Sequence, residues 1–338
     1  MSLHILRPGL LTTVQDSGRF GYLQDGIIVS GAADAVALRV ANLLVGNDER
    51  AAGLEITLLG PRVRFEADHL IALTGAHLSP SINGQPVGRN HAVWVAAGAE
   101  LAFGKAVAGC RAYLAVAGGV AVPLVLGSRA TYLRAGFGGW HGRALQANDQ
   151  LQIGESSATG SALRQALASR QTAWAQARWT PGPNLCPTPR PAPVIRALRG
   201  PEYAQFSAGS QQHFWHSPFT VTAAADRMGY RLQGPALERL VETELLSGAV
   251  TFGTVQVPAG GQALVLLADH QTTGGYPRIA QVITADFPAL AQVRPGQAIR
   301  FQEVSLAEAQ ALYLAQEQQL RALRRGIAQV FLRPLNPK

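Results

Sequence analysis

The chain of 338 residues has few cysteines and few charged residues, and both shortages exclude classes of protein. Its two cysteines, Cys110 and Cys186, form no C-x-x-C pair, so the sequence predicts neither a disulfide framework nor a zinc site. Charged residues are only 15% of the chain and hydrophobic residues are 47%, a composition typical of a globular protein rather than a disordered one.

Long basic runs and long apolar runs are also missing. The formal net charge is +8, but no Lys/Arg run is longer than Arg324-Arg325, so scattered arginines explain the charge and no nucleic-acid interface is expected. The most apolar stretch, residues 114–126, is too short to span a membrane and contains glycines and a proline. The N-terminus reaches Pro-Gly before a signal segment can form, so we expect a cytoplasmic protein with no membrane contact.

Short apolar segments separated by turn residues recur along the chain, which contains 36 glycines and 20 prolines. Strands this short favour a mainly β fold built from barrels or sandwiches. The segments predicted as strands are 54–60, 63–68, 70–75, 92–98, 111–118, 151–154, 219–225, 254–258, 263–269 and 298–304.

Three helices and one connector interrupt this β pattern. Residues 34–46 begin with Asp34 as an N-cap and end at a glycine, and residues 161–179 have helical spacing. Residues 305–326 begin with a capping box, Ser305 followed by Glu308. The proline-rich segment 180–193 predicts a stiff connector, and we place the domain boundary there.

Short matches between the two halves suggest an internal repeat. Residues 60–65 resemble 200–206, residues 96–104 resemble 294–302, and residues 16–22 resemble 226–232. Each match is short, and a true repeat would imply two related β-barrels in tandem.

The sequence lacks the common cofactor motifs. Residues 98–105 resemble a phosphate loop but have the wrong spacing, and His141 replaces the third glycine of a dinucleotide motif at 136–142. His213 and His216 lie three residues apart without further ligands nearby, so we predict no metal site. No biotinylation segment is present, which predicts no covalent biotin on this chain.

Three polar segments rich in glycine remain as candidate binding elements: residues 12–34, 225–232 and 266–283. Arginine can hold a carboxylate through two parallel hydrogen bonds, and Gln, Thr and Tyr side chains can fix an amide. Together the segments suit a small polar substrate that carries a carboxylate. Each segment also has a structural explanation, since Thr272 to Gly275 can be a turn and Asp226-Arg227 a surface ion pair. His270 has the pKa range of a general base, but an isolated loop histidine is usually a bystander.

Eight segments follow one another along the chain in a characteristic order: PGLLTTVQDSGRFGY, SGAADAVALRVANLLVGN, LEITLLGP, ALTGA, RAYLAVAGG, LGSRATYLRAGFGG, DRMGYRL and ADHQTTGGYPRIA. In this order they resemble the carboxyltransferase family that includes the C component of 5-oxoprolinase and allophanate hydrolase subunit 2, together with the Kip-type antagonist of a kinase inhibitor. The resemblance covers roughly residues 5–154 and 190–304.

This resemblance implies a mainly β fold of tandem cyclophilin-like β-barrels with a few helices. On that basis we expect an N-terminal cyclophilin-like domain at 1–154 and a helical insertion with a proline-rich linker at 155–193. A C-terminal cyclophilin-like domain follows at 194–304, and a helix and tail at 305–338. The resemblance also implies hetero-oligomeric partners, namely homologues of the B and A components of 5-oxoprolinase.

The implied function is that of the C component in an ATP-dependent 5-oxoprolinase, which opens the lactam of 5-oxo-L-proline to L-glutamate, with ATP bound in the assembled complex and no activity expected from this chain alone. We expect Arg227 or Arg231 to hold the substrate carboxylate. The alternatives are a biotin-dependent carboxyltransferase component that acts on a urea-like or amide-like substrate, and a non-enzymatic regulator that binds a kinase-inhibitor-type homologue of the B component. The other substrate-binding candidates are Gln15, Arg19, Tyr230, Gln271, Thr272, Thr273, Gly274 and Tyr276, and the candidate proton acceptors are Asp16, Asp226 and Asp269.

Overall fold

The computed structural model describes residues 2–169, 171–240 and 245–332, and its chain divides into two compact units. The N-terminal unit comprises residues 1–18, 34–189 and 317–338, and the C-terminal unit comprises residues 19–33 and 190–316. The division after Pro189 falls inside the proline-rich connector. Neither unit is continuous in sequence, because residues 19–33 belong to the C-terminal unit although their neighbours on both sides belong to the other.

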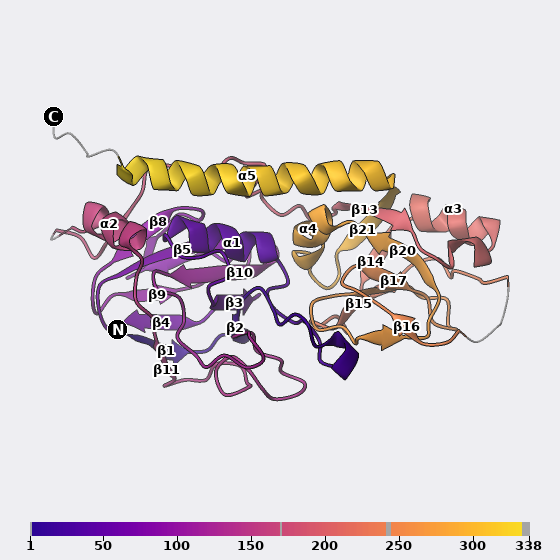
Figure 1. Ribbon diagram of the computed structural model, residues 1–338, viewed down its shortest axis with the longest axis horizontal. Coiled ribbons are helices and arrows are strands. Elements are labelled where there is room, and N and C mark those ends of the chain that lie inside the picture. Colours follow the sequence, from indigo (N-terminus) through magenta and orange to yellow (C-terminus); the bar gives the residue numbers. More distant parts are fainter. Residues whose placement is uncertain (1, 170, 241–244, 333–338) are drawn as a thin grey trace. The chain divides into compact units, whose positions relative to one another are not determined.

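Two six-stranded sheets form the N-terminal unit (Figure 1). The first has the order β11 (Gln150–Gln152), β1 (Ser2–Arg7), β4 (Arg62–Phe65), β9 (Glu100–Ala102), β6 (Ser81–Ile82) and β7 (Gln85–Pro86). The second has the order β12 (Trp174–Gln176), β8 (Ala92–Val95), β5 (His69–His77), β10 (Ala108–Val116), β3 (Gly53–Thr57) and β2 (Leu11–Gln15).

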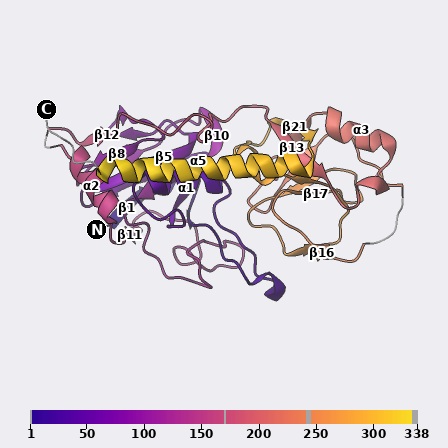
Figure 2. The same ribbon diagram turned by 45° about the horizontal axis from the view of Figure 1, so that its top comes forward.

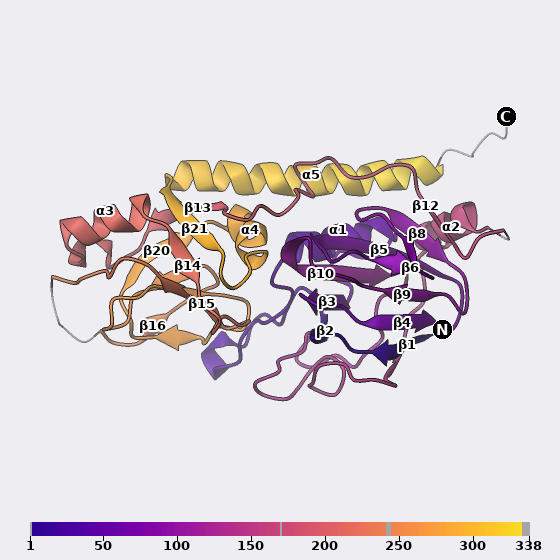
Figure 3. The same cartoon turned by 180° about the vertical axis from the view of Figure 1, so that it is seen from behind.

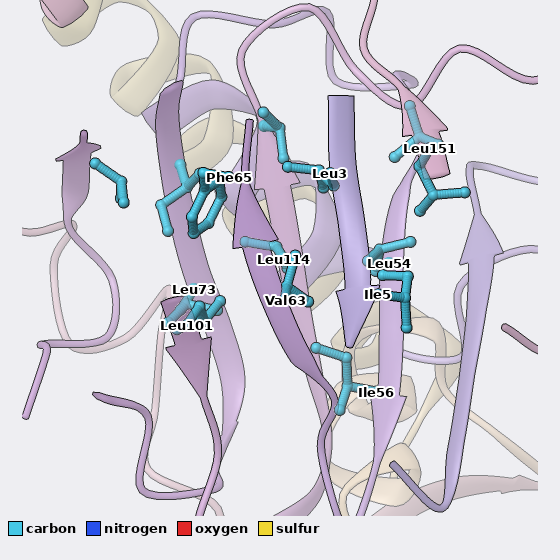
Figure 4. Close-up of a cluster of buried hydrophobic side chains, with 14 of the residues drawn as sticks. Leu3, Ile5, Leu54, Ile56, Val63, Phe65, Leu73, Leu101, Leu114 and Leu151 are labelled. Atoms are coloured by element: carbon cyan, nitrogen blue, oxygen red, sulfur yellow. The ribbon is translucent and has the colours of Figure 1, made fainter. Parts of the chain in front are cut away.

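The core of this unit follows from alternation along the strands. In β1 the side chains of Leu3 and Ile5 are fully buried and their neighbours are not, as expected for a strand with one face on a core. Figure 4 shows these side chains together with Leu54, Val63 and Leu114 from the other strands. Burial of apolar side chains from both sheets therefore holds the sheets together.

A closed barrel forms the C-terminal unit, and Figure 3 shows several of its strands from behind. Its first and last strands pair in parallel, with Ile195 opposite Phe301, and this pairing closes the ladder. The strand order is β13 (Val194–Arg199), β20 (Arg278–Val282), β17 (Thr254–Gln256), β18 (Leu264–Leu266), β15 (Gly229–Gln233), β14 (Phe219–Val221) and β21 (Ala298–Glu303). A separate two-stranded ladder joins β16 (Gly248–Ala249) to β19 (Thr273–Gly274).

Few helices accompany these strands, so the prediction of a mainly β fold with a few helices is confirmed. They are α1 (Ala35–Leu44), α2 (Ala158–Leu167), α3 (Ala208–His216), α4 (Phe287–Ala291) and α5 (Leu306–Leu332), with short 3-10 turns η1 (Leu23–Asp25), η2 (Tyr203–Gln205) and η3 (Thr284–Asp286). Among the described residues, no helix is both long enough and apolar enough to cross a membrane.

Two predicted helix caps are confirmed. The Asp34 carboxylate accepts a hydrogen bond from the backbone N–H of Ala37 at 2.9 Å, which caps α1. Ser305 and Glu308 exchange the two hydrogen bonds of a capping box at the start of α5. Within the N-terminal unit, α5 lies over α1, where Glu317 accepts hydrogen bonds from Arg39 (Figures 1 and 2).

The predicted helix at 161–179 is wrong in its extent. Helix α2 ends at Leu167, and residues 174–176 form β12, which pairs with the edge of β8; position 170 lies outside the described residues. Backbone hydrogen bonds to that sheet edge outweigh a local helical preference. The last helix also continues to Leu332, past the predicted end at residue 326, so part of the predicted tail is helical, and residues 333–338 lie outside the described residues.

The predicted repeat is only partly reflected in the structure. Residues 96–104 and 294–302 each contain a glycine turn followed by a strand, β9 and β21. Residues 60–65, in contrast, lead into strand β4, whereas residues 200–206 form a turn with η2. The match between residues 60–65 and 200–206 is therefore a similarity of sequence without a similarity of backbone structure.

Candidate functional site

The turn before β15 and the residues after β18 meet at one end of the barrel. Strands β15 and β18 pair antiparallel with Gly229 opposite Leu266, so the start of one lies beside the end of the other. The backbone N–H of Asp269 donates to the carbonyl of Arg227 at 2.8 Å. Two of the predicted polar segments, 225–232 and 266–283, are therefore adjacent.

A buried ion pair joins these segments. The Nε of Arg227 donates to Oδ2 of Asp269 at 2.9 Å, and Nη2 donates to Oδ1 at 3.1 Å. Each side chain is only 6% exposed. Two charges withdrawn this far from water are tolerated when they are paired and hydrogen-bonded, so each one requires the other.

The third polar segment contributes residues to the same place. Ser30 lies in the stretch 19–33 of the C-terminal unit, and its Oγ donates to Oδ1 of Asp269 at 2.7 Å. The Nη2 of Arg227 also donates to the carbonyl of Gly31 at 2.5 Å. The site is thus assembled from residues far apart in the chain, at sequence separations of 196 and 239.

The loop after Asp269 is fixed at several points. Thr273 and Gly274 form β19 and pair with Gly248 and Ala249 of β16. Gln256 of strand β17 contacts both ends of the loop: its Oε1 accepts from Gln271 at 3.5 Å. Its Nε2 donates to the carbonyl of Tyr276 at 3.4 Å.

The loop packs closely on Gln256 and also exposes some of its side chains to solvent. A Cβ atom at Gly274 would lie 2.7 Å from the side-chain amide nitrogen of Gln256, so a larger residue there would require that side chain to move. The side chain of Thr273 is exposed and that of Tyr276 is 51% exposed, whereas Gln271 and Thr272 are half-buried. The loop therefore presents hydrogen-bonding groups on a constrained backbone.

The other candidates in the segment 225–232 have different surroundings. The exposed Asp226 accepts hydrogen bonds from the backbone N–H groups of Met228 and Gly229 at 2.8 and 3.2 Å, which orders the turn. Tyr230 is in the barrel core, and its hydroxyl donates to the carbonyl of Val293 at 3.0 Å. Arg231 is exposed on β15.

Gln15 and Asp16 belong to the N-terminal unit, whereas Arg19 belongs to the C-terminal unit and is buried there. The Asp16 carboxylate accepts from the N–H of Gly18 at 2.8 Å, from Oγ of Ser128 at 2.7 Å and from the N–H of Arg129 at 2.5 Å. These bonds hold the loop around residue 128 against the end of β2.

Gln15 is also held by its own unit, because its amide donates to Oγ1 of Thr13 and to the carbonyl of Thr131 at 3.1 and 3.2 Å. In the structure, Gln15 and Asp16 therefore hold the loop around residues 128–131 of their own unit. Arg227 and Asp269, in contrast, contact each other directly.

His270 is buried beside the ion pair. Burial lowers the pKa of its imidazole, against the opposing effect of a hydrogen bond between Nδ1 and the carbonyl of Gln271 at 2.6 Å. The ring is therefore neutral at pH 7 and its Nδ1 is occupied by the backbone. Within the described part of the chain, no three His, Cys, Asp or Glu side chains gather as metal ligands would.

An open groove of about 470 Å³ lies elsewhere on the C-terminal unit. Phe252 and Phe287 stack in it with ring centroids 4.2 Å apart, and Tyr313 of α5 lines it as well. None of its twelve lining residues is charged. A triphosphate needs cations or convergent backbone N–H groups, so the groove does not fit ATP.

The chain belongs to the carboxyltransferase family, since the family description "Carboxyltransferase domain, subdomain A and B" matches residues 25–303. This result confirms the family resemblance seen in the sequence.

Among curated proteins, the chain is 46% identical to the 5-oxoprolinase C component of Escherichia coli, over 94% of this chain and 95% of that protein. It is 42% identical to the 5-oxoprolinase C component of Haemophilus influenzae, over 93% and 94%. It is 30% identical to the urea amidolyase of Lachancea kluyveri, but it spans only 18% of that protein.

Solved structures share the fold. The crystal structure of the K. lactis urea amidolyase matches with a TM-score of 0.85 and 28% identity, over 95% of this chain and 20% of that chain. The Kluyveromyces lactis urea carboxylase matches with the same TM-score and identity, over 96% of this chain and 29% of that chain. This chain thus spans under a third of those longer proteins.

Proposed function

We propose that this chain is the C component of an ATP-dependent 5-oxoprolinase, acting on 5-oxo-L-proline together with homologues of the A and B components. One observation carries the proposal: 46% identity extends over 94% of this chain and 95% of a protein named as the C component of 5-oxoprolinase. The urea amidolyase match is weaker and covers 18% of its protein.

The chemistry of the loop supports a small lactam substrate. A lactam has one carbonyl acceptor and one N–H donor, and side-chain amides and hydroxyls can bind both. Such groups are supplied by Gln271, Thr272, Thr273 and Tyr276. Gly274 has no side chain, so the backbone there can pack against the amide of Gln256. In this proposal these residues orient the ring, and Arg231 or Arg227 holds the carboxylate.

Arg227 can do so only at the expense of Asp269, because Nε and Nη2 already donate to that carboxylate. Arg231, in contrast, is exposed and keeps its charge in solvent. We therefore favour Arg231 for the substrate carboxylate and assign Arg227 to holding Asp269. Of the proposed proton acceptors, Asp269 is the one next to the loop, while Asp226 and Asp16 accept backbone hydrogen bonds in turns.

Lactam cleavage needs an activated leaving group, which ATP supplies when it is bound in the complex. The groove of the C-terminal unit does not fit a triphosphate, and we assign no step that uses ATP to the residues of this chain. The residues of this chain would bind and orient the lactam and accept a proton from the attacking water.

The test is glutamate release from 5-oxoproline with ATP, using this chain alone, the A and B homologues alone, and all three together. Turnover only in the full mixture supports the proposal. In that mixture, Gln271→Ala is expected to lower kcat/KM at least about tenfold with an unchanged unfolding midpoint, since it removes one hydrogen bond to the substrate. Gln262→Ala is the matched control, because Gln262 is exposed on the turn before β18 and bonds to Gly234.

A carboxyltransferase component that uses biotin carried by another protein is the second candidate, favoured by the two urea-converting enzymes that share the fold. It predicts bicarbonate-dependent turnover of a urea-like or amide-like substrate that avidin blocks. Avidin-insensitive turnover excludes it. A stable complex with the B homologue and no turnover of either kind would favour the regulatory alternative.

A further inference from the structure

The backbone of Ser30 has an unusual conformation. Its φ is 56°, which lies in the left-handed region that residues other than glycine, asparagine and aspartate rarely adopt. Gly31 follows with φ 84°. Left-handed backbone at a serine is unfavourable and persists where surrounding contacts hold it. Ser30 is 7% exposed, so these contacts are those of a buried site.

One contact that holds Ser30 is the hydrogen bond from its hydroxyl to Asp269. Oγ of Ser30 donates to Oδ1 at 2.7 Å, and the same oxygen accepts from Nη2 of Arg227 at 3.1 Å. Because Nη2 also donates to the carbonyl of Gly31, three hydrogen bonds and the peptide link between Ser30 and Gly31 join the four residues in a closed ring. A hydroxyl that donates to a buried carboxylate contributes more than one that donates to a neutral acceptor.

Asp269 also lies just before the loop Gln271 to Tyr276, which is proposed to bind the substrate. Its N–H and that of Leu267 donate to the carbonyls of Arg227 and Met228 at 2.8 and 2.9 Å, so backbone bonds align the chain up to Asp269 with the turn that carries Arg227. The far end of the loop is anchored separately, where Arg278 bonds to Glu202. At the near end, the side chain of Asp269 is held by Ser30 and Arg227.

We propose that Ser30 is a positioning residue, whose hydroxyl holds Asp269 and thereby sets the position of the loop Gln271 to Tyr276. The kinetic part of this inference depends on the proposed function, and its structural part does not. A serine that only allowed the turn could be replaced by glycine without loss, since glycine adopts positive φ more readily.

The test compares Ser30→Ala with Ser30→Gly. Both variants lose the hydroxyl, but only the glycine variant relieves the backbone. Ser79→Gly is the matched control: Ser79 has φ 46° and donates to the carbonyl of Lys105 at 2.8 Å, in the N-terminal unit.

The first measurement is hydrogen–deuterium exchange of the isolated chain over residues 266–276. We expect at least about tenfold faster exchange in both Ser30 variants, because a bond to a buried charge is lost, and no change in the control. Exchange in Ser30→Gly equal to that of the unmodified chain would overturn the proposal, whatever the activity of the complex.

The second measurement is turnover by the assembled complex. We expect kcat/KM to fall about tenfold, and equally in Ser30→Ala and Ser30→Gly, although the glycine variant should unfold at the same temperature as the alanine variant or at a higher one. Full activity in the glycine variant contradicts the positioning role. If the unmodified complex releases no glutamate, the proposed function fails, and the exchange measurement alone decides the role of Ser30.

Discussion

Replacing Asp269 with asparagine removes the charge from the buried ion pair while keeping the shape of the side chain. The carboxylate accepts three side-chain hydrogen bonds, from Ser30 at 2.7 Å and from Arg227 at 2.9 and 3.1 Å. Asparagine offers one acceptor oxygen, and its N–H groups then face the donors of Arg227 or Ser30. Breaking one partner of a buried pair costs about 3–5 kcal/mol, and because one acceptor remains we expect about 3 kcal/mol.

Urea unfolding of the isolated chain measures this loss. For a slope near 2 kcal/mol/M, the expected change lowers the unfolding midpoint of the C-terminal unit by about 1–2 M. Hydrogen exchange in the strands β15 and β18 assigns the transition to that unit. Asp226→Asn is the matched control, because the asparagine oxygen can accept the same two backbone bonds, and it should stay within about 0.5 kcal/mol. If the unfolding midpoint of Asp269→Asn lies as close to that of the unmodified chain as the midpoint of Asp226→Asn does, the reasoning is refuted.

Three further predictions concern stability. Hydrogen bonds from Arg278 lower the pKa of Glu202 from its ordinary 4.5, so the ion pair stabilises the fold above that value and is lost as the pH falls through the depressed pKa. The thermal midpoint of Glu202→Gln should therefore fall less than that of the unmodified chain when the pH is lowered from about 6 to about 3.5, roughly one unit below the ordinary pKa of the carboxyl; equal falls would contradict this. Asp34→Ala removes the cap of α1 and should cost about 1 kcal/mol in urea unfolding, with no loss refuting the cap. Tyr113→Phe should cost about 1–3 kcal/mol, since the buried hydroxyl donates to Glu55 and accepts from the N–H of Asp34, each at 2.8 Å; a neutral effect would show that neither group needs it.

Local sequence signals located ten of the 21 strands in the described residues and two helix caps, because those features depend on neighbouring residues. Alternating apolar residues mark strands, and Asp34 and Ser305 act within three residues of themselves. Residues 174–176 could not be recognised in this way. They are in a strand because the edge of β8 is available, and a local helical pattern carries no information about a distant sheet edge.

The same distinction explains the site. Segments 225–232 and 266–283 could be singled out by their polar residues and glycines, but only the barrel pairing of β15 with β18 shows that Arg227 and Asp269 meet. The contribution of Ser30 is harder to predict, since it lies 239 residues from its partner and in a segment whose neighbours in sequence belong to the other unit. The sequence signal that could have found it is the dipeptide Ser30-Gly31, which favours a turn but does not name a partner.

Charged residues are only 15% of this chain, and two of them form the buried ion pair of the site. A buried arginine without a carboxylate would be strongly unfavourable, so Arg227 and Asp269 satisfy each other, and Ser30 and Gly31 complete their hydrogen bonds. Under the proposed function, recognition of the lactam falls to the neutral amides and hydroxyls of the following loop, which can bind it without competing for the ion pair. The ion pair would then hold Asp269 at the start of this loop, and the side chains of the loop would select the substrate.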